Sequence, residues 1–356
     1  MKTKLVYVLT CTPQDTYIEQ ALMSIWSARY HNPNAHIVLV VDDLTNNLLV
    51  GKRAEVLDYI SEKLIVPFEP GKNMHDRSRW LKTKARELIK GDFLYIDTDT
   101  IITCDLSKIE QTEAEIAMVR DENVDFQDEI ESVTTQMMKC CEKVGVDLSK
   151  ERYYFNGGVI YARDTQLVHQ IYDKWHTYWK EGLLVGLPID QPSFAKANIE
   201  FGRPVVLLDD RWNTMAFTYI DEIYSAYILH FWRGVSFLYQ KKCMDYIKHN
   251  GLTDFLKYYV LHPTETFVPS DSHISKYKTK DFYNFYMRMK KALREYGENV
   301  DPSYENFSIK MRSDHFVKWL LMSRLYALAS LVIVLSKWYR VRFSKKFVYK
   351  TNVFKK

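Results

Sequence analysis

Short apolar runs alternate with helix-like stretches in the N-terminal part of the chain. The runs read KLVYVLT, HIVLVVDD, LIVPF and DFLYI, and stretches with helical periodicity separate them. This alternation is typical of βαβ units, because a parallel strand needs a long crossover, usually a helix, to return the chain to the same edge. The pattern predicts an α/β fold with a mainly parallel central sheet flanked by helices.

The remaining expected elements extend this arrangement. Helices are expected over Tyr17 to Tyr30, Lys52 to Lys63, Arg77 to Ile89 and Gln166 to Glu181, and FNGGVIYAR reads as a further strand. Residues 122–150 form a polar, helix-prone insert. Ligands of open parallel sheets bind at the carboxyl ends of strands. Thr10, Asp43 and Asp97 stand at such ends and are candidate site residues.

Two carboxylates follow the fourth apolar run without a gap. In GDFLYIDTDT, Asp97 and Asp99 flank Thr98, and the alternating spacing points both carboxylates to one side. A divalent cation that bridges a diphosphate needs such hard oxygen ligands. A DxD triplet is also expected about once by chance in a chain of this length, and the alternative is a solvated strand-end turn.

Cysteine content and the N-terminus indicate a reducing compartment. Five cysteines are an odd number and form no CxxC pair, which disfavours structural zinc and a disulfide scaffold. The start MKTKLVYVLTCTP imitates a secretion signal, but its apolar run is short and no small-x-small cleavage site follows. We therefore interpret it as the first strand of a cytoplasmic protein.

Charge separates the C-terminal tail from the rest of the chain. From Lys310 onward there are 12 basic residues and one acidic residue, against 37 basic and 44 acidic residues before it. The tail also holds the apolar run from Trp319 to Leu335, which Arg324 interrupts. This combination predicts an amphipathic helical tail, residues 301–356, that lies on an anionic membrane surface rather than on nucleic acid. A helix packed on the catalytic body, residues 1–300, is the alternative.

The order of several motifs indicates a known family. RSRWLKTKARELI, DFLYIDTDT, FNGGVIYAR, DQPSF, LLDDRWN and ILHFWRG follow one another along the chain. This series resembles glycosyltransferases of the GT-A fold, which is Rossmann-like, and most closely family 8, the galactosyl- and glucosyltransferases of bacterial lipopolysaccharide and capsule. The resemblance spans roughly Leu5 to Gly234.

The resemblance implies a metal and phosphate site. Asp97, Asp99 and His230 would bind Mn²⁺ or Mg²⁺, and the imidazole favours manganese. Thr98, between the two carboxylates, would belong to the same cofactor site. The cation would neutralise the leaving nucleotide diphosphate. The positive charges near the phosphates and the donor sugar would come from Arg79, Lys82 and Arg233. The family's lysine after the metal histidine is absent here, and Arg233 is assigned its role.

Further roles follow for the nucleotide, the sugar and the reaction. Thr10, Cys11, Thr12 and Asp43 would hold the base or ribose, with turn and cap residues as the alternative. Asn156, Gly157 and Gly158 would approach the donor sugar, with a plain β-bulge as the alternative. Asp190 and Gln191 match the pair beside the anomeric carbon. Asp190 can also serve as a helix N-cap, with Pro192 in the first turn; Pro192 replaces an acid of the family.

These roles predict a metal-dependent glycosyltransferase. It would move a hexose from a nucleotide sugar, a UDP-hexose, to a saccharide or lipid-linked saccharide acceptor at the inner face of the cytoplasmic membrane, with retention of configuration. A sugar-phosphate nucleotidyltransferase is one alternative, although TCTPQD lacks the glycine and lysine of a phosphate loop. A catalytically inactive membrane-bound protein is the other.

Overall fold

The computed structural model describes residues 1–68, 73–128, 131–216, 223–231, 236–266 and 328. The chain divides into two compact units, residues 1–234 with 238–263, and residues 235–237 with 264–356. The sheets and the candidate site belong to the first unit. The predicted tail lies outside the described residues apart from residue 328, so the boundary at residue 300 and the membrane association remain predictions. None of the helices that the structure describes is long and apolar enough to cross a bilayer.

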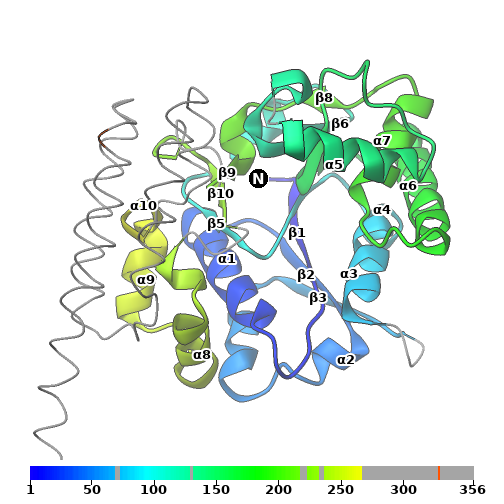
Figure 1. The fold of residues 1–356 in the computed structure, drawn as a ribbon. Coiled ribbons are helices and arrows are strands. Elements are labelled where there is room, and N and C mark those ends of the chain that lie inside the picture. Colours follow the sequence, from blue (N-terminus) through cyan, green and yellow to red (C-terminus); the bar gives the residue numbers. More distant parts are fainter. Residues whose placement is uncertain (69–72, 129–130, 217–222, 232–235, 267–327, 329–356) are drawn as a thin grey trace, which may run out of the picture. The chain divides into compact units, whose positions relative to one another are not determined.

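A seven-stranded sheet forms the centre of the first unit, in the order β3-β2-β1-β4-β7-β6-β8. Figure 1 labels β1, β2, β3, β6 and β8 of this sheet. Its strands are β1 Lys4–Leu9, β2 Ile37–Asp42, β3 Glu62–Val66, β4 Phe93–Ile96, β6 Ile116–Arg120, β7 Phe155–Ala162 and β8 Val206–Leu207. Among these described strands only β7 runs against the others, since it pairs antiparallel with both β4 and β6. The predicted mainly parallel sheet is confirmed.

Both faces of the central strands are buried, which explains why their sequences are continuously apolar. Val6 and Val8 belong to a core with Leu81 and Trp175. That core lies under the helices α3 Met74–Thr83, α4 Ala85–Leu88, α6 Gln166–Leu184 and α7 Gln191–Glu200. On the other face Tyr7 meets Ser24 of α1, Tyr17–His31. Helices therefore cover both faces of the sheet, as predicted.

A second sheet orients the residues that follow Asp99. It consists of β5 Thr100–Ile102, β10 Ile228–His230 and β9 Thr214–Met215, in that order. β5 and β10 are antiparallel, and His230 stands opposite Thr100. This pairing places a histidine from late in the chain next to the carboxylates that end β4.

The remaining described α-helices are α2 Asp43–Asn46, α5 Glu131–Glu142, α8 Lys241–Asn250, α9 Asp254–Leu261 and α10 Pro263–Thr266. The helix expected over Lys52 to Lys63 is wrong in type and extent. A 3₁₀-helix covers Gly51–Tyr59, and β3 begins at Glu62 because residues 62–66 pair with β2. Long-range strand pairing overrides the local helical periodicity there.

Candidate active site

Chain direction explains why the candidate residues meet at one edge of the sheet. The carboxyl ends of β1, β4 and β6 lie at this edge, and the amino end of β7 lies there too because β7 runs the other way. Thr10, Asp97 and Asp121 therefore come to the same edge as Asn156. The order and direction of the strands, rather than any single motif, bring these residues together.

A cavity of about 160 Å³ opens at this edge. Five of the predicted residues line it: Thr10, Arg79, Asp97, Thr98 and Asp99. Further lining comes from residues that the sequence reasoning did not single out, among them Tyr17 and Gln20 of α1, and His75 and Ser78 of α3. Their contribution depends on how α1 and α3 pack on the sheet, which local sequence does not reveal.

Asp97, Asp99 and His230 form a cluster with the chemistry of a metal site. One ligand atom from each lies within 4.8 Å of the others. Two carboxylate oxygens and an imidazole nitrogen suit Mn²⁺. His230 Nε2 is 3.1 Å from Asp99 Oδ1, and the imidazole is nearly buried. These residues would hold the cation, which when bound would neutralise charge that develops on a leaving diphosphate.

The Asp99–His230 pair shifts the pKa of both groups. Burial alone would raise the pKa of the Asp99 carboxyl, but the neighbouring imidazole outweighs it and lowers that pKa. Burial alone would lower the pKa of His230, but Asp99 outweighs it and raises that pKa. The imidazole and the carboxylate stabilise each other's charged form, so a proton competes with any cation for Nε2.

Asp97 is oriented by three further contacts. The Tyr95 hydroxyl donates to Asp97 Oδ1 at 2.6 Å, and Lys82 Nζ lies 3.5 Å from the same oxygen. The Asp97 backbone N–H donates to the Gly158 carbonyl at 2.8 Å, which continues the β4–β7 pairing. Burial and the nearby Asp97 charge raise the pKa of Tyr95 well above its usual value, so the hydroxyl remains a donor.

Two basic side chains of α3 pair with Asp190, and one of them, Lys82, also contacts Asp97. Arg79 Nε is 2.9 Å from Asp190 Oδ1, and Lys82 Nζ is 3.9 Å from Asp190 Oδ2. The Asp190 carboxylate raises the pKa of Arg79 despite burial. Asp190 is the N-cap residue of α7 with Pro192 in the first turn, but its side chain caps no backbone N–H. Its carboxylate is committed to Arg79 instead.

The two glycines of the Asn156-Gly157-Gly158 segment leave room for side chains of the site. A Cβ atom on Gly158 would lie 2.5 Å from His230 Cε1, closer than real Cβ atoms come to other atoms. A Cβ on Gly157 would lie 3.1 Å from Lys82 Nζ. Asn156 itself accepts from the Gly158 N–H at 2.8 Å and donates to Asp121 Oδ1 at 2.7 Å.

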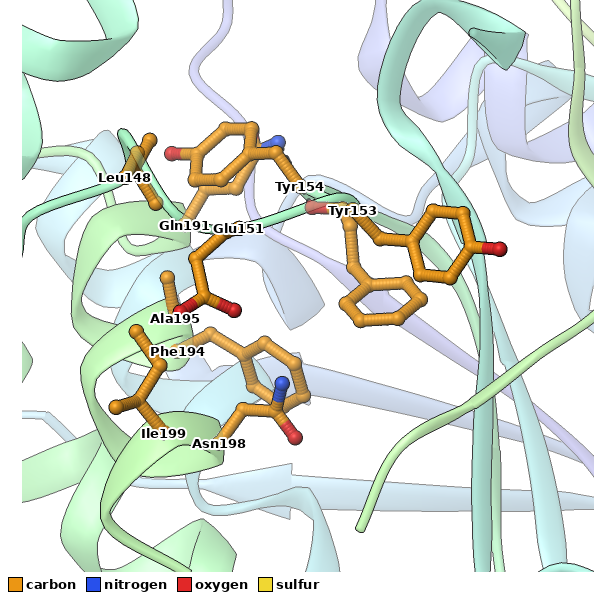
Figure 2. Close-up of a pocket in the computed structure, with 10 residues that line it drawn as sticks. Leu148, Glu151, Tyr153, Tyr154, Gln191, Phe194, Ala195, Asn198 and Ile199 are labelled. Carbon is orange, nitrogen blue, oxygen red and sulfur yellow. Dashed lines mark hydrogen bonds between the residues drawn. The ribbon is translucent and has the colours of Figure 1, made fainter. Parts of the chain in front are cut away.

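Gln191 lies beside a second, much smaller cavity of about 10 Å³, which has room for a single water molecule (Figure 2). Gln191 Nε2 donates to the Phe155 carbonyl at 2.8 Å. Tyr153 and Tyr154 point to opposite sides of their segment. Tyr154 is buried against Phe126, so it belongs to the core.

The other predicted residues differ in their surroundings. The Cys11 N–H donates to Thr45, and Thr12 donates to Asp15, so both stabilise the loop after β1. Asp43 Oδ1 accepts from the Phe68 N–H at 3.2 Å. Arg233 lies outside the described residues.

The neighbouring Asp42 was missed by the sequence reasoning. Its carboxylate is fully buried, and its Oδ2 lies 3.1 Å from Arg77 Nε. This ion pair joins the end of β2 to α3. An apolar run that ends in two aspartates does not reveal which of them faces inward.

Comparisons with known proteins return solved structures only. No family model and no curated protein matches the chain. The galactosyltransferase LgtC, in complex with donor and acceptor sugar analogs, is 16% identical with a TM-score of 0.46, and the match covers 76% of this chain and 98% of that one. Like the two structures below, it is a glycosyltransferase.

Two more structures illustrate the range. Mouse xyloside xylosyltransferase 1 is 15% identical with a TM-score of 0.41, over 64% of this chain and 97% of that one. The glycosyltransferase GlyE of Streptococcus pneumoniae is 17% identical with a TM-score of 0.43, over 76% and 66%. These proteins are of the class that the motifs resemble, but identities and TM-scores this low are no evidence for the chemistry of the site.

Proposed function

We propose that this protein is a metal-dependent glycosyltransferase that uses a nucleotide-sugar donor. The observation that carries the proposal is the Asp97–Asp99–His230 cluster at the rim of the cavity, with Arg79 and Lys82 beside it. A cation site next to two basic side chains suits a diphosphate. The proposal does not depend on the similarity to solved structures, because that similarity is low.

The donor in this proposal lies along the carboxyl edge of the sheet. The diphosphate would lie between the metal ligands and the basic side chains of α3, and the nucleoside would extend toward Thr10 and Tyr17. A hexose is proposed as the transferred sugar and uridine as the base, both from the motif resemblance. A saccharide acceptor completes the reaction.

We further propose that transfer retains the donor's configuration. An inverting displacement needs a free carboxylate as base beside the anomeric carbon. Asp190, the carboxylate at the matching place, pairs with Arg79 at 2.9 Å through one oxygen and faces Lys82 at 3.9 Å with the other, so neither oxygen is directed at a substrate. The adjacent Gln191 is an amide and cannot take a proton in its place.

The experiment is a panel of nucleotide sugars with Mn²⁺, in which release of nucleoside diphosphate is measured. We expect release with one or a few donors, loss of release in excess chelator, and recovery when Mn²⁺ is restored. Asp99→Asn and His230→Gln should fold, by circular dichroism, and lose most of this activity. Undiminished turnover in excess chelator would exclude the metal role. Release of pyrophosphate from a nucleoside triphosphate and a sugar 1-phosphate, supplied in place of the nucleotide sugars, would indicate a nucleotidyltransferase.

Product stereochemistry tests the proposed retention of configuration. An α-linked donor should give an α-linked product, which NMR coupling constants identify. Gln191→Ala should slow turnover more than it weakens donor binding. A β-linked product would exclude retention without affecting the metal assignment.

A further inference from the structure

The loop after β1 is held in place at the backbone of Cys11. The Cys11 N–H donates to Thr45 Oγ1 at 2.9 Å, and Arg77 Nη2 lies 3.5 Å from the Cys11 carbonyl oxygen. This N–H belongs to the peptide group that links Cys11 to Thr10, and Thr10 lines the cavity at the edge of the sheet. The two contacts therefore orient the backbone next to the cavity.

Both partners of Cys11 are held by one carboxylate, that of Asp42 at the end of β2. Asp42 Oδ1 accepts from the Thr45 backbone N–H at 2.5 Å, which makes Asp42 the N-cap of α2. Asp42 Oδ2 lies 3.1 Å from Arg77 Nε. One oxygen thus positions the residue that binds the Cys11 N–H, and the other positions the residue beside the Cys11 carbonyl. We call Asp42, Thr45 and Arg77 the Asp42 network.

The Asp42 network is buried. Asp42 and Thr45 are fully buried, and Arg77 is 3% exposed. Loss of one partner of a buried ion pair leaves a charge unpaired, and a buried backbone N–H without an acceptor is also costly. Water does not reach these groups to replace a lost contact, so the network holds the Cys11 backbone in one position.

The two halves of the loop are anchored separately. Basic side chains from elsewhere in the chain donate to carbonyls in the second half, at Pro13 and Asp15. In the described part of the chain, the first half has the contacts of the Asp42 network and those of the Thr10 hydroxyl, which donates to the Met74 carbonyl at 3.1 Å. The position of the loop where it meets the cavity therefore depends on the Asp42 network.

We propose that Asp42 is a positioning residue for nucleoside binding, which acts through Thr45 and Arg77 on the backbone at Thr10 and Cys11. The inference rests on the proposed function, in which the nucleoside extends toward Thr10. None of these three described network residues is among those that line the cavity. Loss of the network should weaken the part of binding that comes from the nucleoside and leave the part that comes from the diphosphate unchanged. A merely structural role would lower stability without this difference.

The test separates the nucleoside from the diphosphate. The tightest binder among UDP, ADP, CDP and GDP is compared with inorganic pyrophosphate, which carries two phosphates and no nucleoside. Both are titrated into the full chain by calorimetry with Mn²⁺ present. Thr45→Val removes the acceptor of the Cys11 N–H at nearly constant volume. It should weaken nucleotide binding about 10-fold and change pyrophosphate binding less than about twofold.

Two further variants serve as controls. Thr45→Ser keeps the hydroxyl and should bind both ligands like wild-type protein. Asn32→Leu removes another buried acceptor, because Asn32 Oδ1 accepts from the Leu106 N–H at 2.8 Å at the C-terminal end of α1. It should lower the thermal stability and leave both affinities unchanged.

The outcomes separate this inference from the proposed function. A folded Thr45→Val with unchanged nucleotide affinity, or with an equal loss for both ligands, would overturn the role of the network. If Thr45→Val does not fold, Arg77→Lys decides, because it keeps a positive charge opposite Asp42 but lacks the branch that faces the Cys11 carbonyl. It should weaken nucleotide binding more than pyrophosphate binding, and equal changes would overturn the proposal. If wild-type protein binds none of the four nucleotides more tightly than pyrophosphate, the proposed donor is wrong as well.

Discussion

The two ends of the candidate site hold their side chains by different physical means. We call Asp99, His230 and Gly158 the metal corner, and Arg79, Lys82 and Asp190 the cationic corner. In the metal corner, contacts are short and shape decides, since Gly158 has no room for a Cβ and the His230 side chain is 6% exposed. In the cationic corner, charges attract over 2.9 to 3.9 Å, and the Arg79 side chain is 34% exposed although those of Lys82 and Asp190 are buried.

This difference predicts how each corner should respond to substitutions. A corner held by packing and directed hydrogen bonds tolerates little displacement, so one extra carbon should disable it. A corner held by charges adapts, since lysine and arginine side chains are long and can move while they keep their attraction to a carboxylate. The predictions below test this contrast.

The largest expected effect comes from a pair of matched substitutions in β7. Gly158→Ala should weaken Mn²⁺ binding at least about 100-fold, because the new Cβ would displace the imidazole that binds the cation. Gly157→Ala should change it within about threefold, roughly 0.5 kcal/mol, because only the flexible end of Lys82 must move. Neither glycine has a left-handed φ, so backbone strain does not distinguish them. Mn²⁺ affinity is measured by EPR titration. An equal loss of affinity in the two variants would contradict the proposed difference between the corners.

A smaller effect is expected from the cationic corner. Lys82→Met should weaken binding of a nucleoside diphosphate about 10- to 100-fold, the range of a hydrogen bond to a charged group. The loss should shrink as salt is added. Calorimetry at low and high salt measures the loss of nucleotide affinity and its dependence on salt. The control Lys84→Met removes a lysine that pairs with Glu87, and it should leave nucleotide affinity unchanged. A salt-independent loss in Lys82→Met would mean that this corner also depends on shape.

The smallest effect is expected between the corners, at the Tyr95 hydroxyl. Tyr95→Phe removes one donor to Asp97, and the nearby Lys82 compensates in part. Mn²⁺ affinity should fall about 2- to 10-fold, which corresponds to 0.5–1.5 kcal/mol for one hydrogen bond. Tyr7→Phe, a buried control in the same sheet whose hydroxyl meets Ser24, should not change it. A loss as large as that in Gly158→Ala would show that Asp97 has no alternative support.

Local sequence predicted the parts of this structure that depend on neighbours along the chain. The apolar runs of β1, β2 and β4 are buried on both faces, and burial of that kind is visible in composition alone. Asp97 and Asp99 were found because they end such a run. The helix expected from Arg77 begins at Met74, where Asn73 accepts from the Asp76 N–H and caps it.

Contacts between distant segments were not predictable in this way. Asn213 stands in LLDDRWN, which contributed to the family resemblance, yet nothing nearby indicates that its side chain meets Asn156, 57 positions earlier. Asp121 directly follows β6 of the antiparallel pair β6–β7, whose register local periodicity does not specify. His230 was assigned only through the resemblance, because an isolated histidine after two apolar residues is ordinary.

The close approach of Gly158 to His230 also constrains the order in which this protein can change. Replacing His230 by a smaller residue removes the two closest atoms that a Cβ at position 158 would strike and leaves only Asn156 Oδ1, at 2.9 Å, to shift, so alanine costs less there afterwards. The reverse order passes through a variant whose site is distorted. The two positions are therefore epistatic. Loss of this site in evolution is easier when position 230 changes before position 158 than in the reverse order.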